Sequence, residues 1–477
     1  MNNFEVTIGI EVHTVLNTKT KMFSPSLNDH NQKPNTLINE IDLAQPGVMP
    51  SPNKAAVKKA IWLAQEMHMT TNYQYIQFDR KNYFYIDLPK GFQITQQYHP
   101  IGENGYVQIE VNGIKKNILI ERIHMEEDTA KQLSKDNKIY LDYNRSGLPL
   151  IEIVTKPVMS SSLEAAAYLK ELVKILRFAD ISDAKLEEGS LRADINISIR
   201  PYGQKEYGTK VEIKNINSIN NVVKAIDFEI KRQTELLLNN QSVQQETRRF
   251  DDSTNTTIFM RAKTDAVDYR YITEPNIMAI SLSDNDFNQI IAEKNPSLNQ
   301  VYEMLQADGL DSKNIDQLIN DYDFYKVYNQ LKTLTNDPLA SFKWLNTELL
   351  GLLKKDVKDF SDINIELIQK LARMLILLAQ QEINGKQAKT ILEHIYSSNK
   401  EPEIIIKELG FEQIKDKGVI REILMKYIDQ NPKMVEQYYE RPERGEKFFM
   451  GMVMKETNAQ ANPNITVEVL KEILDKK

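Results

Sequence analysis

The sequence predicts an α+β protein, with a strand-rich amino-terminal part followed by an all-helical carboxy-terminal part. Up to about residue 290, short segments alternate between apolar and polar residues, and Gly, Pro and Asn separate them. After about residue 295, apolar residues recur at helical spacing and few strand signals remain. The chain has 477 residues, too many for one ordinary core, so we expect two or three domains.

Two helices are expected to interrupt the strand-rich part. The serine run at residues 160–162 is a natural N-cap for a helix with apolar residues as far as Leu176. The second helix is expected after Asn217 and Ser218, with apolar positions as far as Ile230.

The helical part is expected to begin near Pro296 and Ser297, and its clearest helices fall at residues 339–353 and 365–378. A polar break near residues 397–402 suggests a further boundary. These signals divide the chain into three expected domains, residues 1–293, 294–402 and 403–477.

Composition excludes several classes of protein. The chain has no cysteine, which rules out disulfides, thiolate metal sites and a cysteine nucleophile. No apolar run approaches the roughly 18 residues that span a bilayer, so we expect a cytoplasmic protein without a membrane partner. The net charge of −7 argues mildly against nucleic acid as the main partner, although a local basic surface remains possible on an acidic body.

Several predicted strands carry their charged residues on one face, because residues two apart in a strand share a face. Apolar residues from Val6 to Val12 line one face of the first strand and leave Glu11 and His13 on the other. In the same way, the polar faces of two later strands carry Arg192, Asp194, Arg200, Lys210 and Lys214.

Glu152 differs from these residues because it is a single carboxylate inside the apolar run at residues 148–154. An unpaired buried charge is expensive, so Glu152 needs a cation or strong hydrogen-bond donors. Residues 124–128 add three adjacent acids next to His124, and adjacent acids repel one another unless solvent or a metal intervenes.

Together these residues suggest a site for a divalent metal ion and phosphate. Carboxylate oxygens with an occasional histidine suit magnesium or manganese, and arginine and lysine hold phosphate oxygens. The candidate metal ligands are Glu11, His13, Glu126, Glu127, Glu152 and Asp194, and the candidate nucleotide-binding cations are Arg192, Arg200, Lys210 and Lys214. The alternative is an ordinary solvated sheet face with surface charges, because periodicity does not show which strands are neighbours.

Familiar nucleotide and hydrolase motifs are absent from the sequence. There is no G-x-x-x-x-G-K-[ST] loop, no G-x-G-x-x-G after a strand, no G-x-S-x-G and no H-E-x-x-H. Any ATP is therefore not held by a phosphate loop, and any ammonia has to come from another chain.

At the residues discussed above, the sequence closely resembles the family of aspartyl/glutamyl-tRNA amidotransferase B subunits. The similar blocks include residues 9–13, 21–24, 78–85, 100–102, 124–128, 142–145, 149–154, 187–194, 212–215, 245–248, 268–271 and 460–463. They span nearly the whole chain and are densest before residue 290.

The resemblance implies a glutamine-synthetase-like cradle of antiparallel sheet that carries the active site, followed by helical and tail domains that grip tRNA. It implies a glutamine-hydrolysing carbon–nitrogen ligase in which ATP and magnesium serve to phosphorylate the side-chain carboxylate of Glu-tRNA(Gln) or Asp-tRNA(Asn). Ammonia from the amidase A subunit then reaches the acyl phosphate through a tunnel, and a small C subunit completes a heterotrimer.

By the same resemblance, Glu11, His13, Glu126, Glu127 and Glu152 match the magnesium region, with Asp194 a weaker addition. Lys81 and Lys90 match positions near the tunnel mouth and the active site, and Glu127 is a candidate to gate or deprotonate incoming ammonium. Many relatives have a cysteine pair where this chain has Asn39 and Asp42, so we expect no zinc.

Two alternatives remain open from the sequence. One is an amide-forming ligase of the same fold that acts on a free small acid, which would release phosphate without aminoacyl-tRNA. The other is a tRNA-binding scaffold without catalytic residues.

Overall fold

The amino-terminal unit, Met1–Val301, is built on a nine-stranded sheet. The computed structural model describes residues 4–29, 32–262, 268–457 and 460–474. The strands of the large sheet, in spatial order, are β13 (Thr256–Ala262), β12 (Glu246–Asp251), β11 (Val211–Ile216), β10 (Leu191–Pro201), β1 (Phe4–Val15), β9 (Pro149–Thr155), β6 (Ile114–Glu127), β5 (Gly102–Val111) and β2 (Thr70–Thr71).

Neighbouring strands of this sheet are antiparallel, as expected, except for β11 and β12, which are parallel. The exception follows from the connection between them, because helix α3 (Ile219–Leu238) forms a crossover between the two strands. The sheet is therefore mixed. Its likeness to glutamine synthetase stays a prediction.

Two smaller sheets complete the unit. Strands β3 (Asp79–Asn82) and β4 (Phe92–Thr95) pair with each other, and β3 also pairs with β14 (Ile272–Thr273). Strands β7 (Lys131–Lys135) and β8 (Lys138–Asp142) form a separate hairpin.

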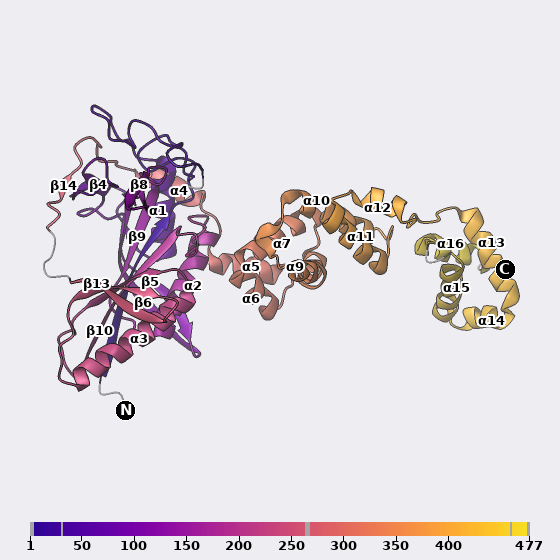
Figure 1. The fold of residues 1–477 in the computed structure, drawn as a ribbon. Coiled ribbons are helices and arrows are strands. Elements are labelled where there is room, and N and C mark those ends of the chain that lie inside the picture. Colours follow the sequence, from indigo (N-terminus) through magenta and orange to yellow (C-terminus); the bar gives the residue numbers. More distant parts are fainter. Residues whose placement is uncertain (1–3, 30–31, 263–267, 458–459, 475–477) are drawn as a thin grey trace. The chain divides into compact units, whose positions relative to one another are not determined.

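Helices cover the apolar face of the large sheet, as Figure 1 shows for α2 (Ser162–Phe178) and α3. Both helices were expected, and both begin at serine N-caps, Ser161 and Ser218. Their buried residues join Ile8, Ile10 and Val12 of β1 in one hydrophobic core. The opposite face of these strands is left for polar side chains.

Two further helices of this unit were missed by the sequence analysis. They are α1 (Lys54–Glu66) and α4 (Asp284–Ala292). Helix α1 begins at Asn53, whose side chain accepts hydrogen bonds from the backbone of Ala55 and Ala56, and it buries Val57 and Ile61. The Asn53 N-cap and the i, i+4 spacing of Val57 and Ile61 can both be recognised in the sequence as signs of a helix.

The second unit, Tyr302–Lys477, is helical throughout its described residues. Its helices, starting with one that overlaps the boundary, are α5 (Leu298–Ala307), α6 (Ser312–Asn320), α7 (Tyr322–Thr335), α8 (Pro338–Lys343), α9 (Leu350–Lys355), α10 (Ile365–Ala379), α11 (Gly385–Ser398), α12 (Pro402–Glu408), α13 (Lys417–Gln430), α14 (Pro432–Glu440), α15 (Pro442–Glu456) and α16 (Pro463–Leu474). A π-helical turn, Trp344–Leu349, joins α8 to α9, where the sequence predicts one helix. Helices α13 to α16 share a core of their own that includes Leu424, Phe449 and Val469. None of the described helices is both long and apolar enough to cross a membrane.

Candidate active site

The register of four adjacent strands brings the predicted acidic residues together. Strands β10, β1, β9 and β6 are neighbours in that order. Across them, Arg192 pairs with His13, His13 pairs with Glu152, and Glu152 pairs with His124. Directly opposed residues on one face have Cβ atoms only about 4.5–5.5 Å apart. The four side chains therefore form one row across the polar face of the sheet.

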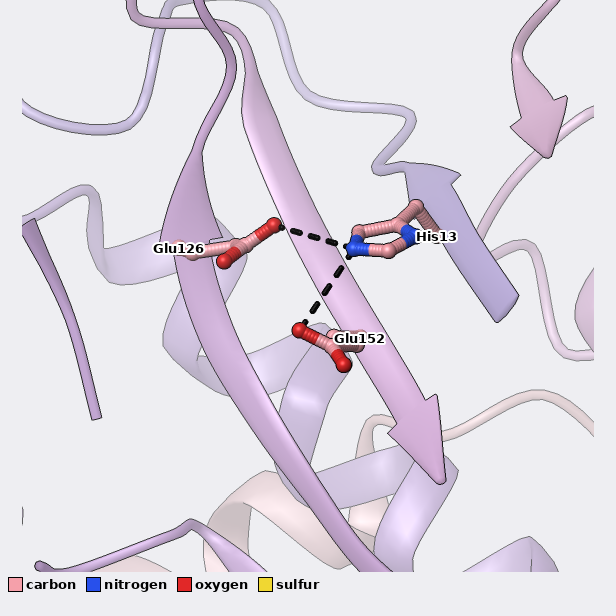
Figure 2. Close-up of side chains that lie close together, drawn as sticks. All are labelled: His13, Glu126 and Glu152. Atoms are coloured by element: carbon pink, nitrogen blue, oxygen red, sulfur yellow. Dashed lines mark ion pairs between the residues drawn. The ribbon is translucent and has the colours of Figure 1, made fainter. Parts of the chain in front are cut away.

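Glu126 joins this row because it lies two residues after His124 on β6 and so shares its face. Figure 2 shows His13 directed toward both carboxylates, with Nε2 3.5 Å from Glu126 Oε1 and 3.4 Å from Glu152 Oε2. Within the described ranges, His13, Glu126 and Glu152 offer ligand atoms that all lie within 4.8 Å of one another. These are three of the six predicted metal ligands.

The electrostatics of this group call for positive charge between the carboxylates. Burial lowers the pKa of His13, but its hydrogen bond to Glu152 and the charges of Glu152 and Glu126 outweigh burial and raise the pKa to about 9. Burial raises the pKa of Glu126. It also acts to raise the pKa of Glu152, yet pairing with His124 and His13 holds that pKa well below its usual value.

The residues present fit a divalent cation. Two carboxylates and an imidazole are a donor set that magnesium or manganese accepts. Nearby, in the described part of the chain, the buried atoms His124 Nδ1 and Asn196 Oδ1 have no hydrogen-bond partner. Buried polar atoms are normally paired, and such exceptions are expected where a site receives a ligand.

Glu11 and Asp194 lie next to the three-ligand group but are engaged otherwise. They face each other across β1 and β10. Glu11 accepts a hydrogen bond of 2.8 Å from Asn196 Nδ2, and Asp194 forms an ion pair with Lys214. The structure therefore places both beside the three-ligand group and outside it.

Glu127 points away from the group, because successive side chains of a strand alternate between faces. Its carboxylate pairs with Lys90 and accepts a hydrogen bond of 2.9 Å from the Ile94 backbone N–H. Its side chain is buried. The structure thus joins two predicted catalytic residues, Glu127 and Lys90, into one pair, and it does not bring Glu127 to the predicted metal ligands.

The group opens into a pocket of about 590 Å³, a volume typical of small-molecule sites. The pocket is lined by residues that include His13, Glu126, Lys81, Arg192, Asp194, Lys214 and Asn217. Predicted catalytic and phosphate-binding cations therefore share this pocket with two of the three ligands. Arg192 is held in place by Asp128, whose Oδ1 lies 3.1 Å from Arg192 Nη2 and whose Oδ2 lies 2.6 Å from Arg145 Nε.

Two predicted nucleotide-binding residues, Arg200 and Lys210, are not in this pocket. Arg200 lies eight residues beyond Arg192 on the same strand, which is about 26 Å at the rise of an extended chain. It pairs there with Glu5, 2.8 Å from Arg200 Nε to Glu5 Oε2. Lys210 is exposed just before β11. Arg192 and Arg200 do lie on the same face of β10, as predicted, but a shared face does not specify where along the strand a residue lies.

Lys214 reaches the pocket through a β-bulge. Ala193 pairs with Ile216 and Ile195 pairs with Ile213, so Lys214 and Asn215 together oppose the single residue Asp194. Asn215 has φ of +60°, in the left-handed region that asparagine tolerates better than most residues. Bulges of this kind re-aim a side chain next to active sites, and here Lys214 is turned toward Asp194.

Sequence reasoning missed His124 as a site residue, although its place two residues before Glu126 on one strand was a usable signal. Its Nε2 lies 3.1 Å from Glu152 Oε2. The roles of Asn196 and Asn215 depend on cross-strand partners and had no sequence signal.

Comparison with known families finds matches in both parts of the chain. Residues 6–288 match the model described as "GatB/GatE catalytic domain", and residues 326–474 match the "GatB domain". The chain is 56 % identical to the B subunit of the aspartyl/glutamyl-tRNA(Asn/Gln) amidotransferase of Ureaplasma parvum serovar 3, with 100 % of both chains covered.

Other relatives with the same description are similar over the same length. The protein of Malacoplasma penetrans is 51 % identical over 99 % of this chain and 98 % of its own. That of Mycoplasma pneumoniae is 43 % identical over 99 % of this chain and 98 % of its own. A buried carboxylate–histidine group, a cation-lined pocket and this full-length similarity lead to one conclusion: the chain belongs to the family of aspartyl/glutamyl-tRNA(Asn/Gln) amidotransferase B subunits.

Proposed function

We propose how this chain, as the B subunit of a glutamine-dependent, tRNA-dependent amidotransferase that forms Gln-tRNA or Asn-tRNA by transamidation, carries out its part of the reaction. We propose that its pocket uses ATP and magnesium to phosphorylate the side-chain carboxylate of glutamate or aspartate esterified to tRNA, and that ammonia then displaces the phosphate. The observation that carries this proposal is the group of His13, Glu126 and Glu152, whose ligand atoms lie within 4.8 Å of one another at a cation-lined pocket.

His13, Glu126 and Glu152 would hold the magnesium ion, with Glu11 and Asp194 beside them. Bound there, magnesium would neutralise part of the phosphate charge as the substrate carboxylate approaches ATP. His124 orients Glu152, because it lies across the strand from that carboxylate with Nε2 3.1 Å from Oε2. Glu152 in turn fixes the ring of His13 from the other side.

Arg192 and Lys214 would bind the phosphates of ATP, because both line the pocket beside the acidic group. Asp128 holds the Arg192 guanidinium, and the bulge at Asn215 directs Lys214. A cation that is already oriented loses less conformational freedom when it binds phosphate. Arg200 and Lys210 are not part of this proposal.

The proposed reaction has two steps. A carboxylate oxygen of the substrate attacks the γ-phosphorus of ATP, the bond to the β-phosphate breaks, and ADP leaves with that electron pair. Ammonia then attacks the carbonyl carbon of the acyl phosphate, and inorganic phosphate leaves as the amide forms. Phosphorylation is needed because the carboxylate is a poor acyl donor and the acyl phosphate is a good one. The first step requires the pocket's cations because a negatively charged carboxylate has to approach the negatively charged phosphates of ATP.

The buried pair of Glu127 and Lys90 would act on the incoming ammonia. The Glu127 carboxylate lies on the face of β6 opposite Glu126, so Glu127 is next to the site and is not one of the metal ligands. Glu127 would accept a proton from an incoming ammonium ion and so keep ammonia nucleophilic. Lys81, which lines the pocket, would mark the place where ammonia enters it.

The assembly we propose contains an amidase A subunit that releases ammonia from glutamine, a small C subunit, and this chain. Within this chain we propose three domains, a catalytic cradle at residues 1–293, a helical domain at 294–402 and a tRNA-binding tail at 403–477. The separate core of α13 to α16 supports an independent tail. Because aminoacyl-tRNA is a cytoplasmic substrate, we place the complex in the cytoplasm.

The test is co-expression with A and C subunits, followed by amidation assays on Glu-tRNA(Gln) and Asp-tRNA(Asn). We expect amide formation only with ATP and a divalent cation, loss of activity with a chelator, and recovery when magnesium is restored. Glu127→Ala should still bind tRNA and lose amidation. Amide formation without ATP would contradict the proposed chemistry, and ADP release without aminoacyl-tRNA would favour a ligase for a free acid.

A further inference from the structure

Five tyrosines form a continuous row of aromatic rings beside the pocket. Along the row, the ring centroids are 5.9 Å apart for Tyr85 and Tyr83, 5.9 Å for Tyr83 and Tyr269, 6.0 Å for Tyr269 and Tyr271, and 6.5 Å for Tyr271 and Tyr98. Every neighbouring pair meets edge to face, an arrangement that aromatic rings favour. Three segments far apart in the sequence supply these rings.

Backbone pairing fixes the segments of this tyrosine row against one another. Strand β14 pairs with β3, with Ile272 opposite Arg80. Just before the start of β14, the Tyr269 carbonyl accepts a hydrogen bond of 3.0 Å from the Asn82 backbone N–H. The Tyr98 hydroxyl donates to the Tyr271 carbonyl at 3.2 Å. The row is therefore held by the fold and does not depend on ring packing alone.

Lys81 connects the tyrosine row to the active site. Its Nζ lies 4.8 Å from the ring centroid of Tyr269 and 5.9 Å from that of Tyr83, and the same side chain lines the pocket with His13 and Glu126. Burial lowers the pKa of Lys81, but Glu126, the neighbouring tyrosines and Glu152 raise it above its usual value. Lys81 therefore links the middle of the tyrosine row to the acidic group.

The rings are too exposed for packing to be their main role. Tyr98 is 57 % exposed and Tyr85 is 60 % exposed, while Tyr83, Tyr269 and Tyr271 are half-buried. Large aromatic side chains that only stabilise a core are buried far more completely. A row of partly exposed tyrosine rings next to a pocket that contains Lys81, Arg192 and Lys214 is suited to stacking with nucleic-acid bases.

We propose that the tyrosine row binds the unpaired bases at the 3′ end of the aminoacyl-tRNA. The reacting carboxylate is joined to the terminal ribose through one amino acid, so the terminal base must lie within the reach of one amino acid and one ribose from the metal group. Single-stranded ends are recognised by stacking on aromatic side chains. The tyrosine row is at the required place and offers the required surface. This inference rests on the proposed function and adds to it a binding site for the substrate's bases.

The experiment measures KM for Glu-tRNA(Gln) and for ATP separately in the assembled complex carrying Tyr269→Ala or Tyr98→Ala. Removing a stacking ring should raise the KM for aminoacyl-tRNA about 5- to 100-fold, with the KM for ATP unchanged. Tyr269→Phe keeps the ring and should behave like the unmodified enzyme. Tyr202→Ala, a control that removes a 77 % exposed tyrosine just after β10, should change neither KM.

An unchanged KM for aminoacyl-tRNA in both alanine variants, with thermal unfolding as in the unmodified complex, would overturn the inference. A raised KM for ATP with an unchanged KM for aminoacyl-tRNA would overturn it too, because the row would then bind the base of ATP. If Tyr269→Ala does not fold, the exposed Tyr98→Ala decides. Failure of the proposed function is distinguishable, because the unmodified complex would then lack ATP-dependent amidation.

Discussion

Charged pairs in the large sheet and in the carboxy-terminal unit show how position decides what a charge can do. In the sheet, Glu126 and Glu152 have side chains only 5 % and 16 % exposed, and both share the ring of His13. In the carboxy-terminal unit, Lys400 just before α12 and Glu408 at its end form an ion pair of 2.7 Å with side chains 46 % and 51 % exposed. The exposed contact is the shorter of the two kinds, yet only the first group is largely removed from water.

The comparison indicates that the candidate active-site residues lie where the register of the sheet brings charged side chains together with little access to solvent. Exposed ion pairs are screened and contribute little, whereas buried charges interact strongly and shift one another's pKa. The upward shift of the His13 pKa and the downward shift of the Glu152 pKa belong to the buried class. Substitutions in the two regions should therefore differ widely in their effects.

The largest effect is expected at the most deeply buried ion pair. Lys21 is 0 % exposed, and its Nζ lies 3.3 Å from Asp42 Oδ2. Asp42→Ala should lower the free energy of unfolding by about 3–5 kcal/mol, because it leaves an uncompensated buried charge. Ser24 and Ser26, which donate to Asp42, would also lose their acceptor. Thermal unfolding measures the effect.

The matched control for this pair removes both charges. Lys21→Met combined with Asp42→Ala should recover part of the lost stability, since no buried charge is left alone. If Asp42→Ala unfolds at the same temperature as the unmodified protein, the Lys21–Asp42 pair does not have the energetics of a buried ion pair.

Glu152→Gln should remove most of the catalysis while preserving the shape of the site. We expect the amidation rate of the complex to fall about 100- to 1000-fold, the usual cost of losing one group that stabilises transition-state charge. Binding of tRNA should be retained. Glu121→Gln, which changes an exposed carboxylate on β6, is the control and should leave the rate unchanged. A normal rate for Glu152→Gln would support the non-catalytic scaffold.

Asn215→Val should have an intermediate effect, because a β-branched residue resists the left-handed conformation of the bulge. Strain of about 1–2 kcal/mol that misdirects Lys214 would lower kcat/KM for ATP about tenfold. Asn215→Gly accepts this conformation and should stay near the original value. Asn240→Val imposes similar strain at φ of +56° in an exposed turn, and should affect stability without changing kinetics. If Asn215→Val and Asn215→Gly have the same kcat/KM for ATP, the bulge does not orient Lys214 for the reaction.

The smallest effect is expected for Glu408→Ala on the helical unit. Breaking its exposed pair with Lys400 should change the free energy of unfolding by about 0–1 kcal/mol, and less at high salt. Denaturation of the full chain at two salt concentrations measures this. A loss as large as that for Asp42→Ala would erase the distinction between the two regions.

Much of the secondary structure was predictable because its signals are local. The serine caps of α2 and α3 and the change to helical spacing after residue 295 can all be read without knowledge of the fold. Helix α1 carried an equally local signal at Asn53 and was missed. The parallel pairing of β11 with β12 was not predictable in the same way, because it depends on where the crossover helix packs.

The residue pattern alone is enough to predict which face of each strand is charged, because side-chain direction follows from a period of two residues. It therefore placed His13 on a polar face and left Arg192 and Arg200 indistinguishable, whereas Glu152 was recognised as a single carboxylate inside an apolar run. Only the tertiary structure decided strand order and register, which depend on packing between distant segments. That register put Arg192 beside His13, left Arg200 with Glu5, and brought His124 and the tyrosine row to the site.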